Sequence, residues 1–78
     1  MTFRFERHIL NDVMDWFSGI RLFNEQVDTV DAKAMVNREA MVCWAIQYGR
    51  YVEVLGPADL REYVGQALRE AGTKYKEE

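Results

Sequence analysis

The sequence predicts an α+β fold in which an antiparallel four-stranded sheet carries two helices on one face, with an additional C-terminal helix. Apolar residues alternate with polar ones in short segments such as Val52-Glu53-Val54, which is typical of strands buried on one face. In longer segments they recur with a helical period. The resulting order is strand, helix, strand, strand, helix, strand, helix. Two interlocked strand-helix-strand units with short right-handed connections satisfy this order, so we expect a ferredoxin-like split βαβ sandwich (β-α-β-β-α-β) followed by a helix.

The N-terminal half supplies the first unit. Residues 2–6 alternate polar and aromatic side chains, with Phe3 and Phe5 on one face. Residues 7–17 then show a helical stripe, which ends at Gly19. The members of this stripe are Ile9, Val13, Trp16 and Phe17. We expect a second strand over residues 20–23, a polar hairpin connection over 24–28, and a third strand from residue 27 or 29 to residue 36.

The C-terminal half supplies the second unit. Asn37 is a favourable cap for a helix over residues 38–48, and Gly49 ends that helix. The strand over residues 51–55 is stopped by Gly56-Pro57, because proline suits the first position of a helix and offers no strand N–H. The last helix runs from Pro57 to near Tyr75 and residues 76–78 are expected to fray. This helix either covers the free face of the sheet or extends as an arm toward a partner.

Composition excludes several functional classes. The 78 residues allow one domain, over residues 1–78. The net charge of −3, with acidic and basic residues interspersed, argues against a nucleic-acid-reading surface. The longest apolar run, residues 41–46, is far shorter than the roughly 20 residues that span a membrane. A single cysteine and no signal-peptide pattern indicate a cytoplasmic location.

Catalytic chemistry has little support in this sequence. His8 is the only histidine and has no evident nucleophile or orienting partner. We expect Cys43 to be a buried thiol, and one cysteine with one histidine cannot form a structural zinc set. Asp12 and Asp15 are expected on a solvated helix face. We therefore expect no enzyme activity, no metal and no cofactor.

Two arginines are candidate ligand-binding residues. Arg61 follows Gly56-Pro57 in the first turn of the last helix, where free backbone N–H groups favour anions. Its structural alternative is an ion pair with Glu53 or Glu62. Arg4 alternates with Phe3 and Phe5, so it points from the opposite face of the sheet, where it has either a structural partner or a ligand.

Aromatic residues are too numerous for a core of this size. Some of them should therefore lie on the surface, where a contiguous patch would mark an interface. The candidates are Tyr48, Tyr51, Tyr63 and Tyr75; the alternative is a scatter of half-exposed rings. RNA binding through the sheet face is disfavoured, because the third strand has no aromatic residue and the chain is acidic.

Several segments resemble one known family. These are Trp44-Ala45-Ile46-Gln47-Tyr48-Gly49, Val52-Glu53-Val54-Leu55-Gly56-Pro57, Leu60-Arg61, the terminal Tyr75, and the opening Thr2-Phe3-Arg4-Phe5 with the Trp16-Phe17 helix. Together they are similar to the C-terminal extension (WCX) of WYL-domain transcriptional regulators. Gln47, Gly56 and the lack of a glycine in the hairpin depart from the family pattern.

The resemblance implies a regulatory and dimerisation module of a bacterial DNA-binding transcriptional regulator, excised from a longer chain. Its partners would be the WYL and helix-turn-helix domains of the same chain, a second copy of the protein, and DNA held by the missing N-terminal domain. A nucleic-acid or small-molecule effector is also implied, and no membrane. The alternative is a ligand- or oligonucleotide-sensing domain acting through Arg61 and Arg4. An enzyme of the acylphosphatase kind would share the fold, but the arginine-bearing glycine loop of that family is missing.

Overall fold

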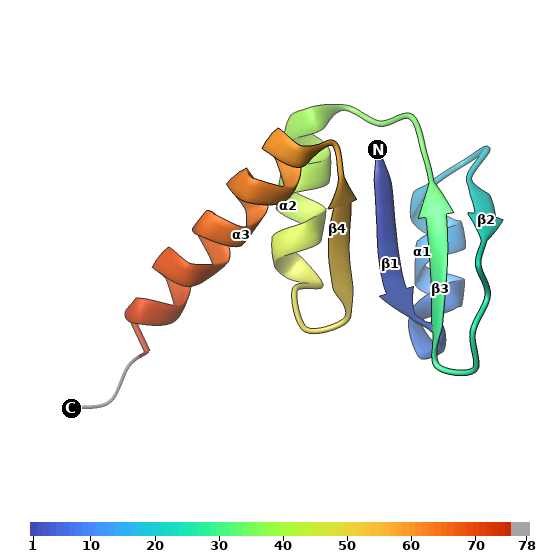
Figure 1. Ribbon diagram of the computed structural model, residues 1–78, viewed down its shortest axis with the longest axis horizontal. Helices are drawn as coiled ribbons and strands as arrows, with labels where there is room; N and C mark the ends of the chain where they lie inside the picture. Colours follow the sequence, from blue (N-terminus) through green and yellow to red (C-terminus); the bar gives the residue numbers. More distant parts are fainter. Residues whose placement is uncertain (76–78) are drawn as a thin grey trace.

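An antiparallel sheet with strand order β2-β3-β1-β4 organises the computed structural model, which describes residues 1–75. The strands are β1 (Thr2–Glu6), β2 (Arg21–Phe23), β3 (Thr29–Lys33) and β4 (Val52–Gly56). β1 lies at the centre and pairs with both β3 and β4 (Figure 1). This is the arrangement expected of two interlocked strand-helix-strand units, so the predicted ferredoxin-like fold is confirmed.

The helices occupy two different places around this sheet. A 3₁₀ turn (Arg7–Ile9) leads into α1 (Leu10–Trp16), and the longer helices are α2 (Arg38–Gln47) and α3 (Ala58–Thr73). Both α1 and α2 lie on one face of the sheet, whereas α3 leaves the end of β4 and runs away from the body of the molecule (Figure 1). The free face of the sheet is therefore not covered by α3, which packs against β4 and α2.

Aromatic rings fill the space between the sheet and the helices. Phe3 is fully buried at 0% exposure, and its ring centroid lies 5.5 Å from that of Trp44 and 5.4 Å from that of Phe17. The Phe17 and Trp44 rings meet edge to face at 5.0 Å, a favourable geometry for aromatic pairs. Phe5 and Val54 extend the same core along β1 and β4. The alternation of apolar residues in both strands thus has the predicted orientation.

The expectations for two elements need correction. β3 ends at Lys33 and not at residue 36, since Val36 lies in the connection to α2. Trp16, placed by its spacing on the buried stripe of α1, is 55% exposed. The helix ends at Trp16, and Phe17 turns into the core with an extended backbone, φ −118° and ψ 115°. Phe17 therefore contacts Phe3 and Trp44, and the Trp16 ring stays outside.

The expected burial of Cys43 is also wrong, because its thiol is exposed. The buried residues of α2 are Met41, Trp44 and Ala45. Successive helical residues are rotated by about 100°. Cys43 consequently points to nearly the opposite side of the helix from these three residues.

The predicted cap of α2 is confirmed, whereas Pro57 precedes α3 as its N-cap residue and is not its first helical residue. Asn37 caps α2, with its side-chain oxygen accepting from the Ala40 backbone N–H at 3.2 Å. Asn24 has a φ of 49° at the start of the β2–β3 connection. Asparagine tolerates this left-handed conformation better than most residues, so the hairpin needs no glycine there.

None of the helices within residues 1–75 is long and apolar enough to cross a membrane. The expected fraying of Lys76, Glu77 and Glu78 lies outside the described residues.

We predict that Phe3→Ala lowers the free energy of unfolding by about 3–5 kcal/mol, because it opens a cavity between the sheet and Trp44. Urea unfolding followed by circular dichroism measures this change. Met35→Ala is the control, since Met35 is 100% exposed and its truncation should change stability by less than about 0.5 kcal/mol. Equal effects of the two substitutions would contradict the assigned core.

Candidate functional site

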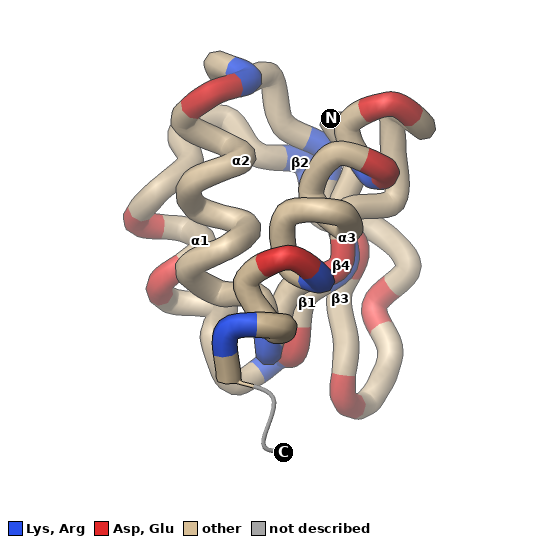
Figure 2. Tube along the Cα trace, turned by 90° about the vertical axis from the view of Figure 1, so that its left-hand side faces the viewer, with Lys and Arg blue, Asp and Glu red and all other residues tan. Residues whose placement is uncertain are grey.

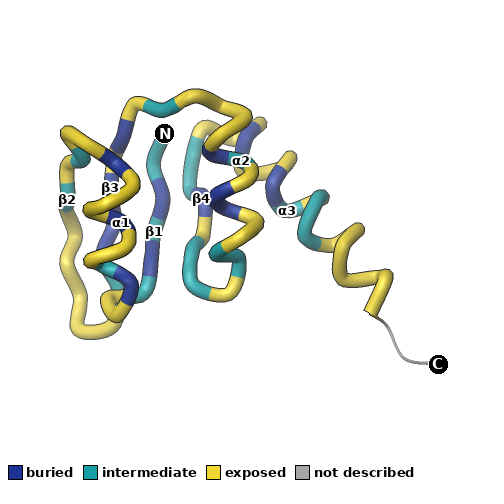
Figure 3. The backbone as a smooth tube through the Cα atoms, turned by 180° about the vertical axis from the view of Figure 1, so that it is seen from behind, coloured by how far each residue is buried: buried dark blue, intermediate teal, exposed yellow. Residues whose placement is uncertain are grey.

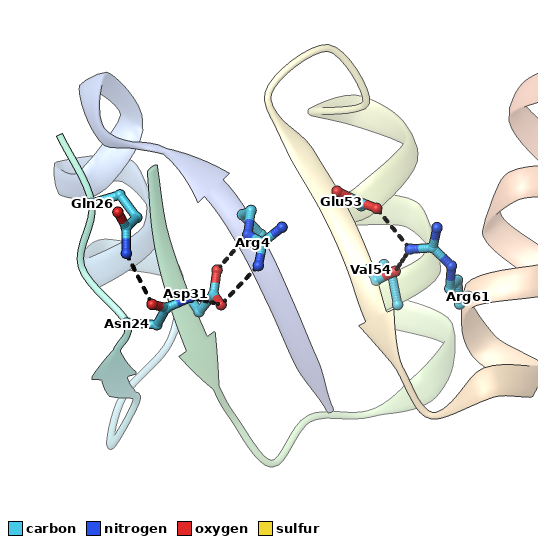
Figure 4. Close-up of polar contacts among 7 residues, drawn as sticks. All are labelled: Arg4, Asn24, Gln26, Asp31, Glu53, Val54 and Arg61. Carbon is cyan, nitrogen blue, oxygen red and sulfur yellow. Dashed lines mark hydrogen bonds and ion pairs between the residues drawn. The ribbon is translucent and has the colours of Figure 1, made fainter. Parts of the chain in front are cut away.

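A polar network lies on the sheet face that α1 and α2 leave free. The guanidinium of Arg4 donates twice to the Asp31 carboxylate, from Nε at 2.7 Å and from Nη2 at 3.2 Å. The amide of Asn24 also donates to Asp31, at 2.9 Å, and Gln26 donates in turn to Asn24 (Figure 4). Arg4 and Asp31 are direct cross-strand neighbours in the β1–β3 register. The network therefore ties β1, β3 and the β2–β3 connection together.

Asp31 is the only buried charged residue among residues 1–75, at 3% exposure. Its hydrogen bonds from Arg4 lower its pKa, burial opposes this by raising the pKa, and the bond from Asn24 lowers it further. The same pair raises the pKa of Arg4. A buried carboxylate needs such partners to remain charged. Arg4 thus has a structural partner, and an external anion would have to compete with Asp31 for it.

Arg61 forms a second polar contact, which joins α3 to β4. Its Nη1 atom donates to the Glu53 carboxylate and to the Val54 carbonyl, both at 2.8 Å (Figure 4). Glu53 was one of the two structural partners that the sequence suggested. A groove of about 490 Å³ opens beside this contact, between β4 and α3. The anion-binding role of Arg61 stays a prediction, and an anion would have to displace Glu53.

Charges elsewhere on the surface are mixed in sign (Figure 2). Arg38 at the start of α2 pairs with Asp59 in the first turn of α3, at 2.9 Å. The hydrogen bond from Arg38 lowers the pKa of Asp59, and backbone N–H groups at the helix start contribute in the same direction. This pair connects the beginnings of the two helices.

The four candidate interface tyrosines fall into two groups. Tyr63 on α3 and Tyr75, two residues beyond its end, are 57% and 85% exposed. Tyr48 and Tyr51 are half-buried against the core, where Tyr48 packs on Trp44 and Tyr51 meets His8 edge to face. The structure does not bring the four rings into one patch, and their role in an interface stays a prediction.

The apolar stripe of α3 is only partly covered by the rest of the chain. Leu60 and Val64 are buried, Ala67 and Leu68 are half-buried, and Ala71 is exposed. Burial thus decreases steadily along the helix, as the colours in Figure 3 show. After Leu68, no other part of residues 1–75 covers the stripe.

Sequence reasoning missed two features of these surfaces. Asp31 was not identified from the sequence as the partner of Arg4, although the two residues lie directly opposite each other in the β1–β3 register. Trp16, Met14 and Met35 are exposed apolar side chains that were not among the interface candidates. An antiparallel register drawn for β1 and β3 could have found Asp31, whereas no local signal marks Trp16.

No cluster of metal-ligating side chains occurs among the described residues. His8 contacts Glu6 at 3.0 Å on the surface. Arg4, Arg38 and Arg61 each form an ion pair with a carboxylate.

Taken together, the sheet order, the paired arginines and the partly covered last helix define a small ferredoxin-like α+β module with an appended helix. The family model described as the WCX domain matches residues 2–72. The chain therefore belongs to the WCX family and is a regulatory C-terminal domain of the WYL-associated kind. No curated protein matches it.

We predict that Asp31→Asn destabilises the protein at pH 7 by about 1–3 kcal/mol, because Arg4 loses its charged partner. The folded-state pKa of Asp31 lies below the ordinary value of 3.8. The stabilisation from the carboxylate is therefore fully present above that value and is lost as pH falls through the folded-state pKa.

Unfolding measured from pH 7 to pH 2 should show a constant difference between the two proteins near neutrality and a decreasing difference in acid. Asp59 titrates in both proteins, so its contribution cancels. A difference that does not change with pH would contradict a charged Asp31–Arg4 pair.

Proposed function

We propose that this chain is the C-terminal regulatory and dimerisation module of a WYL-type bacterial transcriptional regulator that acts in the cytoplasm. DNA would be read by a separate helix-turn-helix domain, and the module would couple the WYL domain to the state of the dimer. Membership of the WCX family supports the regulatory class. The observation that carries the dimerisation part is the uncovered stripe of α3.

The physical reason is that the C-terminal end of α3 lacks tertiary support. The helix spans 16 residues, or about 24 Å, but its apolar residues pack against the rest of the molecule only as far as Leu68. Short helical segments without tertiary packing are marginal in water, and Gly72 weakens this one further by about 1 kcal/mol relative to alanine. A partner surface that covers Ala71 and Tyr75 would supply the missing packing.

The same stripe suits a symmetric contact between two copies. Tyr63 flanks it and Tyr75 lies near its far end, so two helices crossing there would each bring a tyrosine to the contact. Tyrosine is enriched in the energetically important part of interfaces because it buries a large area at low entropic cost. The module without a partner exposes both rings.

We predict that the chain self-associates in a concentration-dependent manner and that Ala71→Glu weakens the dimer at least tenfold. The substitution places an unpaired charge in the contact, and each 1.4 kcal/mol corresponds to about a factor of ten. Sedimentation velocity over a range of concentrations measures the dissociation constant.

Gln66→Glu is the matched control, since it adds the same charge to α3 away from the stripe and should leave association unchanged. A strict monomer at every concentration would contradict dimerisation through α3 and leave docking onto the other domains of the same chain.

The second candidate function is sensing of a ligand or an oligonucleotide through Arg61 and Arg4. Titration with short oligonucleotides at low salt distinguishes it, with Arg61→Ala as the control variant. Binding that Arg61→Ala abolishes would favour sensing. Because Arg61 and Arg4 are both engaged by carboxylates, we expect no such binding.

A further inference from the structure

β4 is an edge strand whose outer backbone groups face α3. The Glu6 backbone N–H donates to the Tyr51 carbonyl at 2.9 Å, which makes Glu6–Tyr51 a hydrogen-bonded pair in the antiparallel ladder. Such pairs alternate with non-hydrogen-bonded ones. Two pairs in the register are therefore non-hydrogen-bonded, namely Phe5–Val52 and Phe3–Val54. The N–H and C=O groups of Val52 and Val54 thus point away from β1, toward the open edge.

Arg61 shows that this edge takes up a hydrogen-bond donor. Its Nη1 atom lies 2.8 Å from the Val54 carbonyl oxygen, a distance within the range of ordinary N–H···O hydrogen bonds. Among residues 1–75, no other side chain hydrogen-bonds to the backbone of β4. Edge strands with free backbone groups readily pair with another extended chain.

The groove beside β4 has room for such a chain. Val52, Val54 and Leu68 give it an apolar floor, and Gly49 and Gly65 are among its lining residues. Gly65 lies in the middle of α3, where glycine costs about 1 kcal/mol relative to alanine.

The fold itself does not require glycine at position 65. A Cβ atom there would meet only the Arg69 Nη1 atom, at 3.3 Å, at the movable end of a side chain. Because Gly65 has no side chain, the groove between α3 and β4 is wider at this position.

We propose that an extended peptide segment binds in this groove as an additional strand, antiparallel or parallel to β4, between the edge of the sheet and α3. Strand addition of this kind combines main-chain hydrogen bonds with pockets for alternate side chains. The five residues of β4 span about 17 Å, so a segment of about five residues matches the edge.

The lining of the groove defines the chemistry of the segment. Alternate side chains would lie over Val52, Val54 and Leu68 and should be apolar. Arg69 lines the same groove and forms no ion pair within residues 1–75, so an acidic side chain placed next to it complements its charge. Glu62 also lines the groove and would repel a carboxylate near it, so the acidic side chain belongs at the Arg69 side of the groove. The strand's own N–H would replace Arg61 at the Val54 carbonyl and leave Arg61 with Glu53.

A second copy of β4 fits this edge less well than such a peptide. Antiparallel self-pairing with Val52 opposite Val54 would place Glu53 directly opposite Glu53 of the second copy. Like charges in that position are destabilising. Leu68 belongs both to the groove and to the apolar stripe of α3, but Ala71, the exposed part of the stripe that we assign to dimerisation, does not line the groove. Substitutions at position 65 and at position 71 therefore test the two proposals separately.

The test selects ligands for the 78-residue chain from a phage-displayed library of random decapeptides and measures synthetic versions by fluorescence anisotropy. We expect enriched peptides with alternating apolar residues and a carboxylate. Gly65→Gln should weaken their binding at least tenfold because its side chain fills the groove, although it raises the thermal midpoint as a better helix former. Gly72→Gln makes the same exchange on α3 where nothing lies within 4 Å, and it should leave binding unchanged.

Peptides N-methylated at single positions then test for main-chain pairing. Methylation of the N–H groups that face β4 should weaken binding at least tenfold, whereas methylation at the intervening positions should have little effect. The amide of Val52 should exchange more slowly with solvent when the peptide is bound.

The proposal is overturned if no peptide is enriched, or if the Gly65→Gln variant binds the peptides as tightly as the original chain. It is also overturned if N-methylation at the positions facing β4 leaves the affinity of the peptides unchanged. It is also overturned in favour of a second copy if Gly65→Gln abolishes self-association of the chain.

Discussion

The two-residue alternation of β1 is the constraint on which the rest of this structure depends. Because β1 is the central strand that joins β3 to β4, each of its faces organises one side of the molecule. On the helix side, Phe3 packs against Phe17 and Trp44, and Phe5 lies in the same core. On the opposite face, Arg4 binds Asp31, which also accepts a hydrogen bond from Asn24. A shift of one residue in the register would place a guanidinium in the aromatic core.

The position of α3 links this scaffold to function. The Gly56-Pro57 corner sends the helix along the open edge of β4 and not across the free sheet face. Two ion pairs fix the first turn of α3: Arg61 binds Glu53 on β4, and Asp59 binds Arg38 at the start of α2. The helix thereby offers one face to the groove beside β4 and another, apolar, to solvent. Exposed ion pairs of this type add little stability, so the buried Leu60 and Val64 contribute most to the packing of this end of the helix.

Much of the candidate site could be predicted one residue at a time. The spacing placed Arg4 and Phe3 on opposite sheet faces and suggested Glu53 as a partner of Arg61, and both assignments hold. The errors arose where contacts between elements overrule local pattern. Trp16 has the spacing of a core residue, but Phe17 occupies the available space. Cys43 lies in an apolar segment, yet α2 buries only the side that faces the sheet.

The sequence by itself determined the elements, their order and the inward faces of β1 and β4, because strand and helix periods are local properties of the chain. It also sufficed to suggest the WCX family. Only the tertiary structure decided that Asp31 would be buried, that α3 would leave the sheet face open, and that a groove would remain between α3 and β4. These features depend on the distance and angle between segments far apart in the chain, and side-chain packing sets both.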